Sequence, residues 1–373
     1  MKLNRHCRGW VVATLACLAL SPAWAQIRIG QTAGFTGPVA AGVKETTEGA
    51  RLYLDSVNKN GGINGQAIEL VSLDDKFEPP LAAENARKLI DDGVLALFLT
   101  RGTPHNQAII PLVTAAHVPL IAPSTGSMVL HQPVQPWVFN VRASYQREAE
   151  RAVRHLSLIG MSRIGLVHVN DSFGEDGAKG AMTGFKAVGR EPAVDEKFDR
   201  EKPDLAPVIA KLVKADVQAV IVVGSGTVVA DALGKLRAAG SRAQLVTLSN
   251  NASQGFIKTL GDNARGTIIT QVFPYERSIN NGMVKEAMGL VAAQGKGAEL
   301  TPAMLEGFAG AKVLVEALKR ASPNITRERI KSALESFKRY DLGGLEVSFS
   351  TTDHSGLDYS DLSIVGEDGH FRR

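Results

Sequence analysis

Cysteine is almost absent from this sequence, which has two in 373 residues. Both of them, Cys7 and Cys17, fall within the first 25 residues. The chain from residue 26 onward therefore has no disulfide framework, no thiolate zinc or iron–sulfur site and no cysteine nucleophile. Tryptophan is equally scarce there, because Trp137 is the only one after residue 25.

An excess of positive charge is also missing. Three of the 42 basic residues lie in residues 1–25, which hold no acidic residue, so residues 26–373 carry 39 basic and 38 acidic side chains. Neutralisation of phosphates supplies most of the affinity of nucleic-acid-binding proteins. Since this part of the chain is nearly neutral and has no basic stripe, we expect no nucleic-acid partner.

No apolar run after residue 25 approaches the roughly 20 residues that a membrane-spanning helix needs. Residues 1–25 instead combine a basic start, an apolar stretch over 10–20 and small residues before a cut after Ala25. This is the layout of a cleaved secretory signal, so we expect an exported protein that begins near Gln26. The apolar stretch is too short for a membrane anchor. Thr14 stands where a lipoprotein signal has a large aliphatic residue, which disfavours lipid attachment at Cys17.

Short apolar runs alternate with longer amphipathic ones over residues 26–373. The first kind predicts buried strands and the second predicts helices. Such alternation is typical of βαβ units, and hence of an α/β fold with parallel sheets covered by helices. The predicted strands are 27–31, 67–73, 95–100 and 118–122, then 163–169, 193–198, 217–223 and 244–248, and finally 267–272, 345–349 and 362–365. The predicted helices are 44–60, 81–92, 145–159, 175–188, 205–214, 227–239, 281–294, 303–321 and 326–337.

The pattern restarts after Arg142 without a Ser/Gly/Pro-rich linker. Two similar α/β series joined in this way predict two lobes that meet across a cleft. The first series runs out of strands too early for a covered sheet, so part of the less regular tail must complete it.

The loops that follow the predicted strands are the places to search for a site, because ligands of open parallel sheets bind outside the carboxyl ends of the strands. Segments 101–104 and 123–127 combine small hydroxyl residues with glycine, which suits a carboxylate. Helix capping by Thr103 and Ser124 explains the same residues equally well. In the second series, Phe173 either covers a ligand or packs on its own helix.

Sequence motifs for cofactor binding and catalysis are missing. Segment 224–230 resembles a dinucleotide fingerprint, but the acidic residue expected about 20 positions later is absent, since the next strand is followed by Ser249-Asn250-Asn251. The eight histidines form no ligand-spaced pair. We therefore expect no cofactor, no metal and no catalytic residue. An α/β hydrolase or dehydrogenase stays an alternative, because catalytic groups can converge from distant loops.

Four segments together resemble the periplasmic leucine/isoleucine/valine-binding protein family, the substrate-binding components of ABC importers. They are 27–38, 61–65 with the following strand and Asp74-Asp75, 118–124, and 171–174. The resemblance implies the type I periplasmic binding fold, in which two Rossmann-like lobes with parallel sheets are joined by three crossovers and hold a ligand between them. With crossovers near 141, 272 and 350, lobe one would be 26–141 plus 273–350, and lobe two 142–272 plus 351–373, after a signal peptide at 1–25.

The resemblance further implies a periplasmic receptor that binds a small amino acid or related organic carboxylate and delivers it to the transmembrane subunits of an ABC permease. In the family, hydroxyls and backbone amides of lobe one hold the ligand carboxylate, and an aromatic residue of lobe two closes over it. Tyr275, beside the second crossover, is an added candidate. The expected ligand-binding residues are Thr103, Ser124, Thr125, Gly126, Phe173, Ser225, Asn250 and Tyr275.

The sequence departs from the family's amino-acid binders where they place an acidic residue against the ligand ammonium. Ser249-Asn250 occupies that place, and Gly42 and Ser225 replace two family aromatics. Because burying an ammonium without a counter-charge costs several kcal/mol, a zwitterion would need another anchor. The candidates for that anchor are Asp171, Glu276 and Glu306.

A carboxylate without an α-amino group, aromatic or aliphatic, fits the sequence as well as an amino acid does. A second alternative function is a ligand-sensing periplasmic domain that acts with a signalling partner. Receptors of that kind carry spanning segments, for which this sequence shows no candidate.

Overall fold

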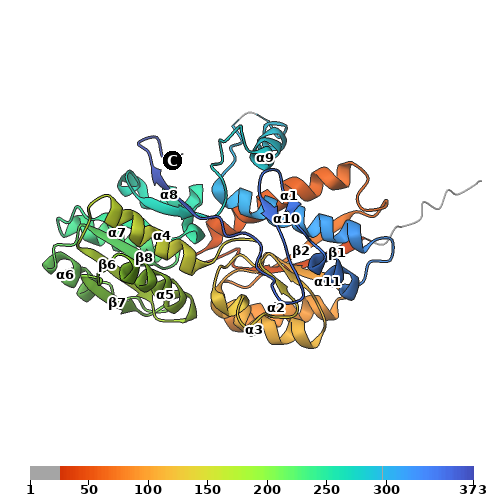
Figure 1. Cartoon of the computed structure of the whole chain (residues 1–373), viewed down its shortest axis with the longest axis horizontal. Coiled ribbons are helices and arrows are strands. Elements are labelled where there is room, and N and C mark those ends of the chain that lie inside the picture. The colour runs from red at the N-terminus through yellow and green to blue at the C-terminus, as the bar shows by residue number, and fades with distance from the viewer. Residues whose placement is uncertain (1–25, 296) are drawn as a thin grey trace, which may run out of the picture.

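The computed structural model describes residues 26–295 and 297–373, and the signal predicted for residues 1–25 lies outside them. Two open sheets, each covered by helices, form the two halves of the molecule (Figure 1). This confirms the predicted α/β class with parallel sheets. None of the helices described is both long and apolar enough to cross a membrane.

The first sheet contains five parallel strands in the order β2–β1–β3–β4–β5. Its central strands are short apolar runs that are buried on both faces, as expected for a parallel sheet covered on both sides. The strands are β1 (Ile27–Ala33), β2 (Ile68–Asp74), β3 (Ala96–Phe98), β4 (Leu120–Ile121) and β5 (Val138–Phe139).

Two groups of helices cover opposite faces of this sheet. Leu97 packs into a cluster with α2 (Pro79–Asp91) and α3 (Thr103–Ala115), whereas its neighbour Phe98 packs into a cluster with α1 (Ala40–Lys59) and α10 (Pro302–Ala321). Successive residues of a strand point to opposite faces, which explains the division. The tail of the chain thus completes this half with α9 (Gly282–Ala292), α10, α11 (Arg327–Glu335) and the hairpin β11–β12 (Tyr340–Asp341, Glu346–Val347).

The second sheet has seven strands in the order β14–β13–β10–β9–β8–β6–β7. The five strands β6 to β10 are parallel to one another, and β13 and β14 add an antiparallel edge. Its strands are β6 (Ile164–Val169), β7 (Val194–Phe198), β8 (Ala219–Val223), β9 (Gln244–Thr247), β10 (Ile268–Gln271), β13 (Asp361–Val365) and β14 (Phe371–Arg372). Its helices are α4 (Tyr145–Leu158), α5 (Ser172–Ala187), α6 (Ala206–Lys214), α7 (Gly226–Ala238) and α8 (Gln254–Leu260).

Polar residues of the expected type begin several helices. The Ser144 hydroxyl accepts from the Arg147 amide at the start of α4, and Asp171 accepts from the Phe173 and Gly174 amides at the start of α5. Such caps satisfy amide groups that have no partner within the helix. They also fix where each helix leaves the carboxyl end of the preceding strand.

Candidate functional site

The carboxyl ends of the two sheets face each other across a narrow, partly open cavity of about 20 Å³, and a cavity of about 240 Å³ adjoins it at Val39 and Asn250. Val39, Phe77, Arg101 and Thr103, from the loops after β1, β2 and β3, line the narrow cavity on one side. On the other side it is lined by Tyr145, Phe173, Arg200, Ser225 and Asn250, most of them in the loops after strands of the second sheet. This is the place at which open parallel sheets bind ligands.

Half of the eight predicted site residues line this cavity, namely Thr103, Phe173, Ser225 and Asn250. Ser124 and Thr125 lie directly behind it. The Ser124 hydroxyl accepts a hydrogen bond from Nη1 of Arg101 at 2.8 Å, and the Thr125 and Thr103 hydroxyls are bonded at 2.8 Å. These two residues therefore support side chains of the cavity wall.

The hydroxyls of Thr103 and Ser124 do not cap helices, which was the alternative role that the sequence offered for them. Thr103 is the first residue of α3, Gly102 occupies the cap position, and no side-chain cap bond forms there. Ser124 follows β4 in a loop. Their hydroxyls are instead part of the wall of the cavity and of its support.

Gly126 leaves room for a neighbouring segment because it has no side chain. A Cβ atom on Gly126 would lie 2.7 Å from the Ala143 carbonyl oxygen, closer than non-bonded atoms approach. The Tyr145 amide donates to the Gly126 carbonyl at 2.8 Å. Gly126 therefore lets the segment that follows the first sheet pass close by, and this brings Tyr145 to the cavity.

Phe173 and Tyr145 form an aromatic wall on the side of the second sheet. Their rings meet edge to face with centroids 4.9 Å apart, and both side chains are buried. Edge-to-face contact is a favoured geometry for aromatic pairs. Phe173 therefore lines the cavity and also lies in the first turn of α5, so both interpretations of this residue stay open.

Asn250 connects the loops of the second sheet at the cavity. Its side-chain amide donates to the Gly224 carbonyl at 3.0 Å, and its backbone carbonyl accepts from Nη2 of Arg101 at 2.6 Å. Its Oδ1 has no hydrogen-bond partner among the residues described. Asn250 therefore offers one free acceptor and is in direct contact with the opposite sheet's loops.

Tyr275 does not line the cavity. Its hydroxyl donates to the Phe371 carbonyl at 3.2 Å, and its ring lies 5.9 Å from the guanidinium of Arg373. The structure places it near the carboxyl-terminal strand, apart from the other predicted site residues.

Arg101 is the most consequential cavity residue that was not predicted from the sequence. Its side chain is only 5% exposed and reaches from the loop after β3 to Ser124 and to Asn250. The predicted loop 101–104 contains it. To choose Arg101 as a site residue from the sequence, one would have to know that loops of the second sheet cover its side chain.

Phe77 is a second cavity residue that sequence reasoning missed. It and Lys76 have φ values of +63° and +53°, in the left-handed region that non-glycine residues rarely adopt. The buried Asp75 carboxylate holds this turn by accepting from the Phe77 amide at 2.9 Å, and the Thr32 hydroxyl donates to it at 3.0 Å. Burial raises the pKa of Asp75 to about 6.

His105 lies beneath Phe77, with ring centroids 4.4 Å apart in a stacked arrangement. It is completely buried, and burial lowers its pKa to about 4. The imidazole is therefore neutral at pH 7 and forms part of the uncharged support of the Phe77 ring.

The three acidic residues considered as ammonium anchors all lie elsewhere. Asp171 caps α5 and pairs with Arg200, and Glu306 pairs with Arg142 at 3.6 Å. Burial raises the pKa of Glu276. None of these carboxylates lines the cavity.

A buried ionic cluster stabilises the segment between the two sheets. Arg142 and Glu148 are both less than 3% exposed and form an ion pair, and Glu148 also accepts from the Ser249 amide at 2.9 Å. Burial lowers the pKa of the Arg142 guanidinium, but Glu306 and Glu148 more than offset this, so its pKa is raised overall. The cluster fixes the crossover next to the loop that carries Asn250.

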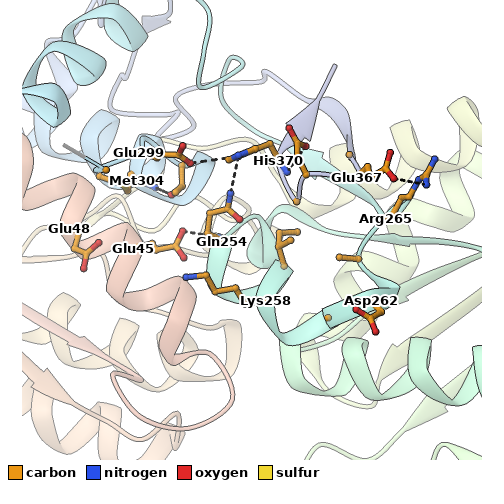
Figure 2. A pocket seen from close by; sticks show the side chains of 18 residues that line it. Glu45, Glu48, Gln254, Lys258, Asp262, Arg265, Glu299, Met304, Glu367 and His370 are labelled. Carbon is orange, nitrogen blue, oxygen red and sulfur yellow. Dashed lines mark hydrogen bonds and ion pairs between the residues drawn. The ribbon is translucent and has the colours of Figure 1, made fainter. Parts of the chain in front are cut away.

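A much larger and open cavity, of about 800 Å³, lies between the two halves away from the strand ends (Figure 2). Glu45 of α1 reaches across to the start of α8, where its carboxylate accepts from the Gln254 amide at 3.0 Å and from the Gly255 amide at 2.8 Å. Burial raises the pKa of Glu45. The Glu299 carboxylate also pairs with His370 across this cavity, at 3.6 Å (Figure 2). Since this cavity is a gap between helices, the candidate ligand site is the smaller cavity at the strand ends.

Over residues 26–295 and 297–373, no group of three or more His, Cys, Asp or Glu side chains is arranged to hold a metal ion. The chemistry that the site offers is therefore that of its hydroxyls, amides, aromatic rings and two guanidinium groups.

The family model described as periplasmic binding protein matches residues 26–363. A Leu/Ile/Val-binding protein homologue from Brucella melitensis is 23% identical over 337 residues, which cover 89% of each chain. A substrate-binding periplasmic protein from Ralstonia solanacearum has a similar structure, with a TM-score of 0.84, 32% identity and coverage of 93% of this chain and 99% of that one. A possible leucine/isoleucine/valine-binding protein from Rhodopirellula baltica gives a TM-score of 0.88 at 26% identity, with 95% and 98% covered.

Proposed function

Since this chain belongs to the periplasmic binding protein family, of the type I fold that includes the leucine/isoleucine/valine-binding proteins, we propose that it is the exported solute receptor of an ABC importer. It binds a small amino acid or a related organic carboxylate between its two halves and delivers it to the transmembrane subunits of a permease. The family consists of binding proteins, which agrees with the lack of catalytic motifs in the sequence.

The observation that carries this proposal is the cavity at the facing carboxyl ends of the two sheets. Loops of both sheets line it with hydroxyl, amide and aromatic groups. A ligand held there touches both halves at once. Binding therefore favours the closed arrangement over an open one, because a ligand shifts the population toward the state in which it makes more contacts.

We propose that the two lobes are residues 26–141 plus 273–350 and residues 142–272 plus 351–373. Membership of the strands supports this division, because β1–β5 form one sheet and β6–β10 with β13 and β14 form the other. The chain then passes between the lobes three times, and these passages act as the hinge.

A thermal-shift panel on the purified chain without residues 1–25 tests the receptor function. The panel contains branched-chain amino acids, their keto acids, and aromatic and aliphatic carboxylates. A ligand present at 100 times its Kd adds about 2.7 kcal/mol to the free energy of unfolding, so it raises the melting temperature clearly.

The chemical fate of the ligand separates a receptor from an enzyme. We expect denaturation to release one unchanged ligand per chain. Chemical conversion of the ligand would favour the enzyme alternative, and a panel without any stabilising compound would contradict the proposed receptor for amino acids and organic carboxylates.

A further inference from the structure

We propose that the solute is a carboxylate anion with an apolar body and no ammonium group, and that Arg101 is the residue that selects it. This inference rests on the proposed receptor function and names the class of ligand. It follows from the charge that the closed site buries and from the shape of its walls.

Arg101 has only neutral partners. Its Nη1 donates to the Ser124 hydroxyl at 2.8 Å and its Nη2 to the Asn250 carbonyl at 2.6 Å. The neighbouring arginines of the site each pair with a carboxylate, Arg200 with Asp171 and Arg142 with Glu148. In the part of the chain that the structure describes, no carboxylate lies within 4.0 Å of the Arg101 guanidinium.

The walls of the cavity therefore carry a net positive charge. The residues that line it include two guanidinium groups and no carboxylate, and only the charge of Arg200 is compensated by an adjacent acid. Removing a charge from water is costly unless a counter-charge is provided. An anionic ligand provides that counter-charge, whereas the ammonium group of an amino acid would meet a guanidinium and no acid.

The remaining walls suit an apolar body. Phe77 lies over the neutral His105 on one side, and Tyr145 and Phe173 form the aromatic pair on the other. Aromatic faces and edges favour a flat ring or a compact aliphatic chain between them. A polar head on Arg101 and an apolar body against these rings thus satisfy the whole site.

The absence of a side chain at Gly42 leaves the space that the guanidinium uses. A Cβ atom on Gly42 would lie 3.7 Å from both Nη2 of Arg101 and the Asn250 carbonyl oxygen. An aromatic side chain at position 42 would extend from that Cβ into the region of the guanidinium. A side chain larger than a methyl group at position 42 would therefore compete with Arg101 for this space.

Arg101 also links binding to closure. It belongs to the loop after β3 of the first sheet, and its Nη2 donates to the carbonyl of Asn250, which follows β9 of the second sheet. A carboxylate that binds the guanidinium stabilises a charge that is buried only when the two halves are together. Ligands without this negative charge lose that contribution.

Matched ligand pairs test the inference on the wild-type protein by isothermal titration calorimetry. The pairs are 3-phenylpropanoate with phenylalanine and 4-methylpentanoate with leucine, which differ only in the α-amino group. We expect the deaminated acid of at least one pair to bind at least 10-fold more tightly than its amino acid. The neutral amide of the same acid should bind about 100-fold more weakly than the acid, because it lacks the charge-assisted hydrogen bonds.

Variants of Arg101 give a second, independent readout. Arg101→Met should weaken binding of the acid by about 100-fold and binding of the amide much less, by the lost contact with Asn250 alone, while Arg101→Lys should restore part of the affinity for the acid. The matched control is Arg237→Met. Arg237 is another arginine whose guanidinium has only neutral partners, the carbonyl groups of Ser241 and Ala243, and it lies outside the cavity. The Arg237→Met variant should leave the affinities for the acid, the amide and the amino acid unchanged.

Each failure has its own meaning. An amino acid that binds as tightly as its deaminated partner overturns this inference and leaves the receptor function standing. Equal losses for acid and amide in the Arg101 variants overturn the role of Arg101, because they indicate a structural defect. If neither the acids nor the amino acids bind, the proposed function fails together with the inference.

Discussion

Asp75 holds the loop that brings Phe77 to the cavity. Titration of its carboxyl group changes the free energy of unfolding in a direction that its pKa predicts. The carboxylate is fully buried and accepts from the Phe77 amide and the Thr32 hydroxyl. Burial raises its pKa from 3.8 to about 6. The folded protein therefore binds the proton more tightly than the unfolded chain does, and the contribution of Asp75 to the free energy of unfolding decreases as the pH rises from about 4 to about 6.

Replacement of Asp75 by asparagine should remove this pH dependence, because the amide keeps an oxygen for the Phe77 amide and carries no charge. Relative to wild type, the variant should gain about 2–3 kcal/mol of unfolding free energy between pH 4 and pH 7. Urea unfolding followed by the fluorescence of the buried Trp137 measures the difference. If the difference in unfolding free energy between the variant and the wild type stays constant over this pH range, the raised pKa of Asp75 is wrong.

At the scale of single residues, the sequence located the right loops better than the right side chains. Thr103, Phe173, Ser225 and Asn250 line the cavity, because each follows a strand whose end could be predicted, and their contact with a ligand stays a prediction. Arg101 was missed because its burial depends on Asn250, 149 positions further along the chain. Contacts between loops of different sheets leave no local pattern in a sequence.

At the scale of helices and strands, alternation of apolar runs predicted the parallel sheets correctly. The elements that were missed are β5, α3, α8, β14 and the two-residue strand β11. The strands β5 and β14 have two residues each, which is too short for any periodicity, and α3 contains Pro111 within an almost continuous apolar run. The short α8 has seven residues, and its first amide groups bond to Glu45 of the other half, so part of what holds it is a tertiary contact.

The contact of α8 with α1 provides a test of closure that leaves the binding cavity itself unchanged. A Cβ atom on Gly255 would lie 2.3 Å from the Cβ of Ala41 in α1. Gly255→Ala should therefore push the two halves apart, reduce the population of the closed state and raise the Kd by about 10-fold, in proportion to the lost population. Calorimetric titration with the strongest ligand of the panel measures the change.

Two further variants make this prediction specific. Gly234→Ala in α7 is the matched control, because a Cβ there has no atom within 4 Å and should leave the Kd unchanged. Ala41→Gly combined with Gly255→Ala removes the methyl group that would clash and should restore binding. If the double variant binds as weakly as Gly255→Ala alone, the effect arises within α8, and the proposed closure contact is wrong.

At the scale of the whole molecule, the contacts that join the two halves include three formed by Ser172, Arg101 and Glu45. The Ser172 hydroxyl donates to Gln107 at 2.6 Å, Arg101 donates to the Asn250 carbonyl, and Glu45 accepts from the start of α8. All three are polar contacts that water can replace when the halves separate. Most of the hydrophobic core is divided between the two halves, and the residues of the second lobe that pack into the first cluster, Ala143, Val272 and Leu357, lie near the crossovers. This division favours motion of the halves as rigid bodies about the crossovers.

The small size of the cavity between the strand ends favours opening of the two halves before a solute binds. A volume of about 20 Å³ admits little more than a water molecule. The adjoining cavity of about 240 Å³ shares Val39 and Asn250 with it, so we expect movement of the two halves to join the two spaces into one site. Small-angle X-ray scattering should give a radius of gyration near 20 Å for the ligand-saturated chain without its first 25 residues, as its length predicts for a compact protein. The ligand-free protein should give a larger value, and Gly255→Ala should keep the larger value at ligand concentrations that close the wild type. Identical scattering with and without a ligand that calorimetry shows to be bound would mean that the site fills without movement of the two halves, and the cavity between their loops would then have to expand locally instead.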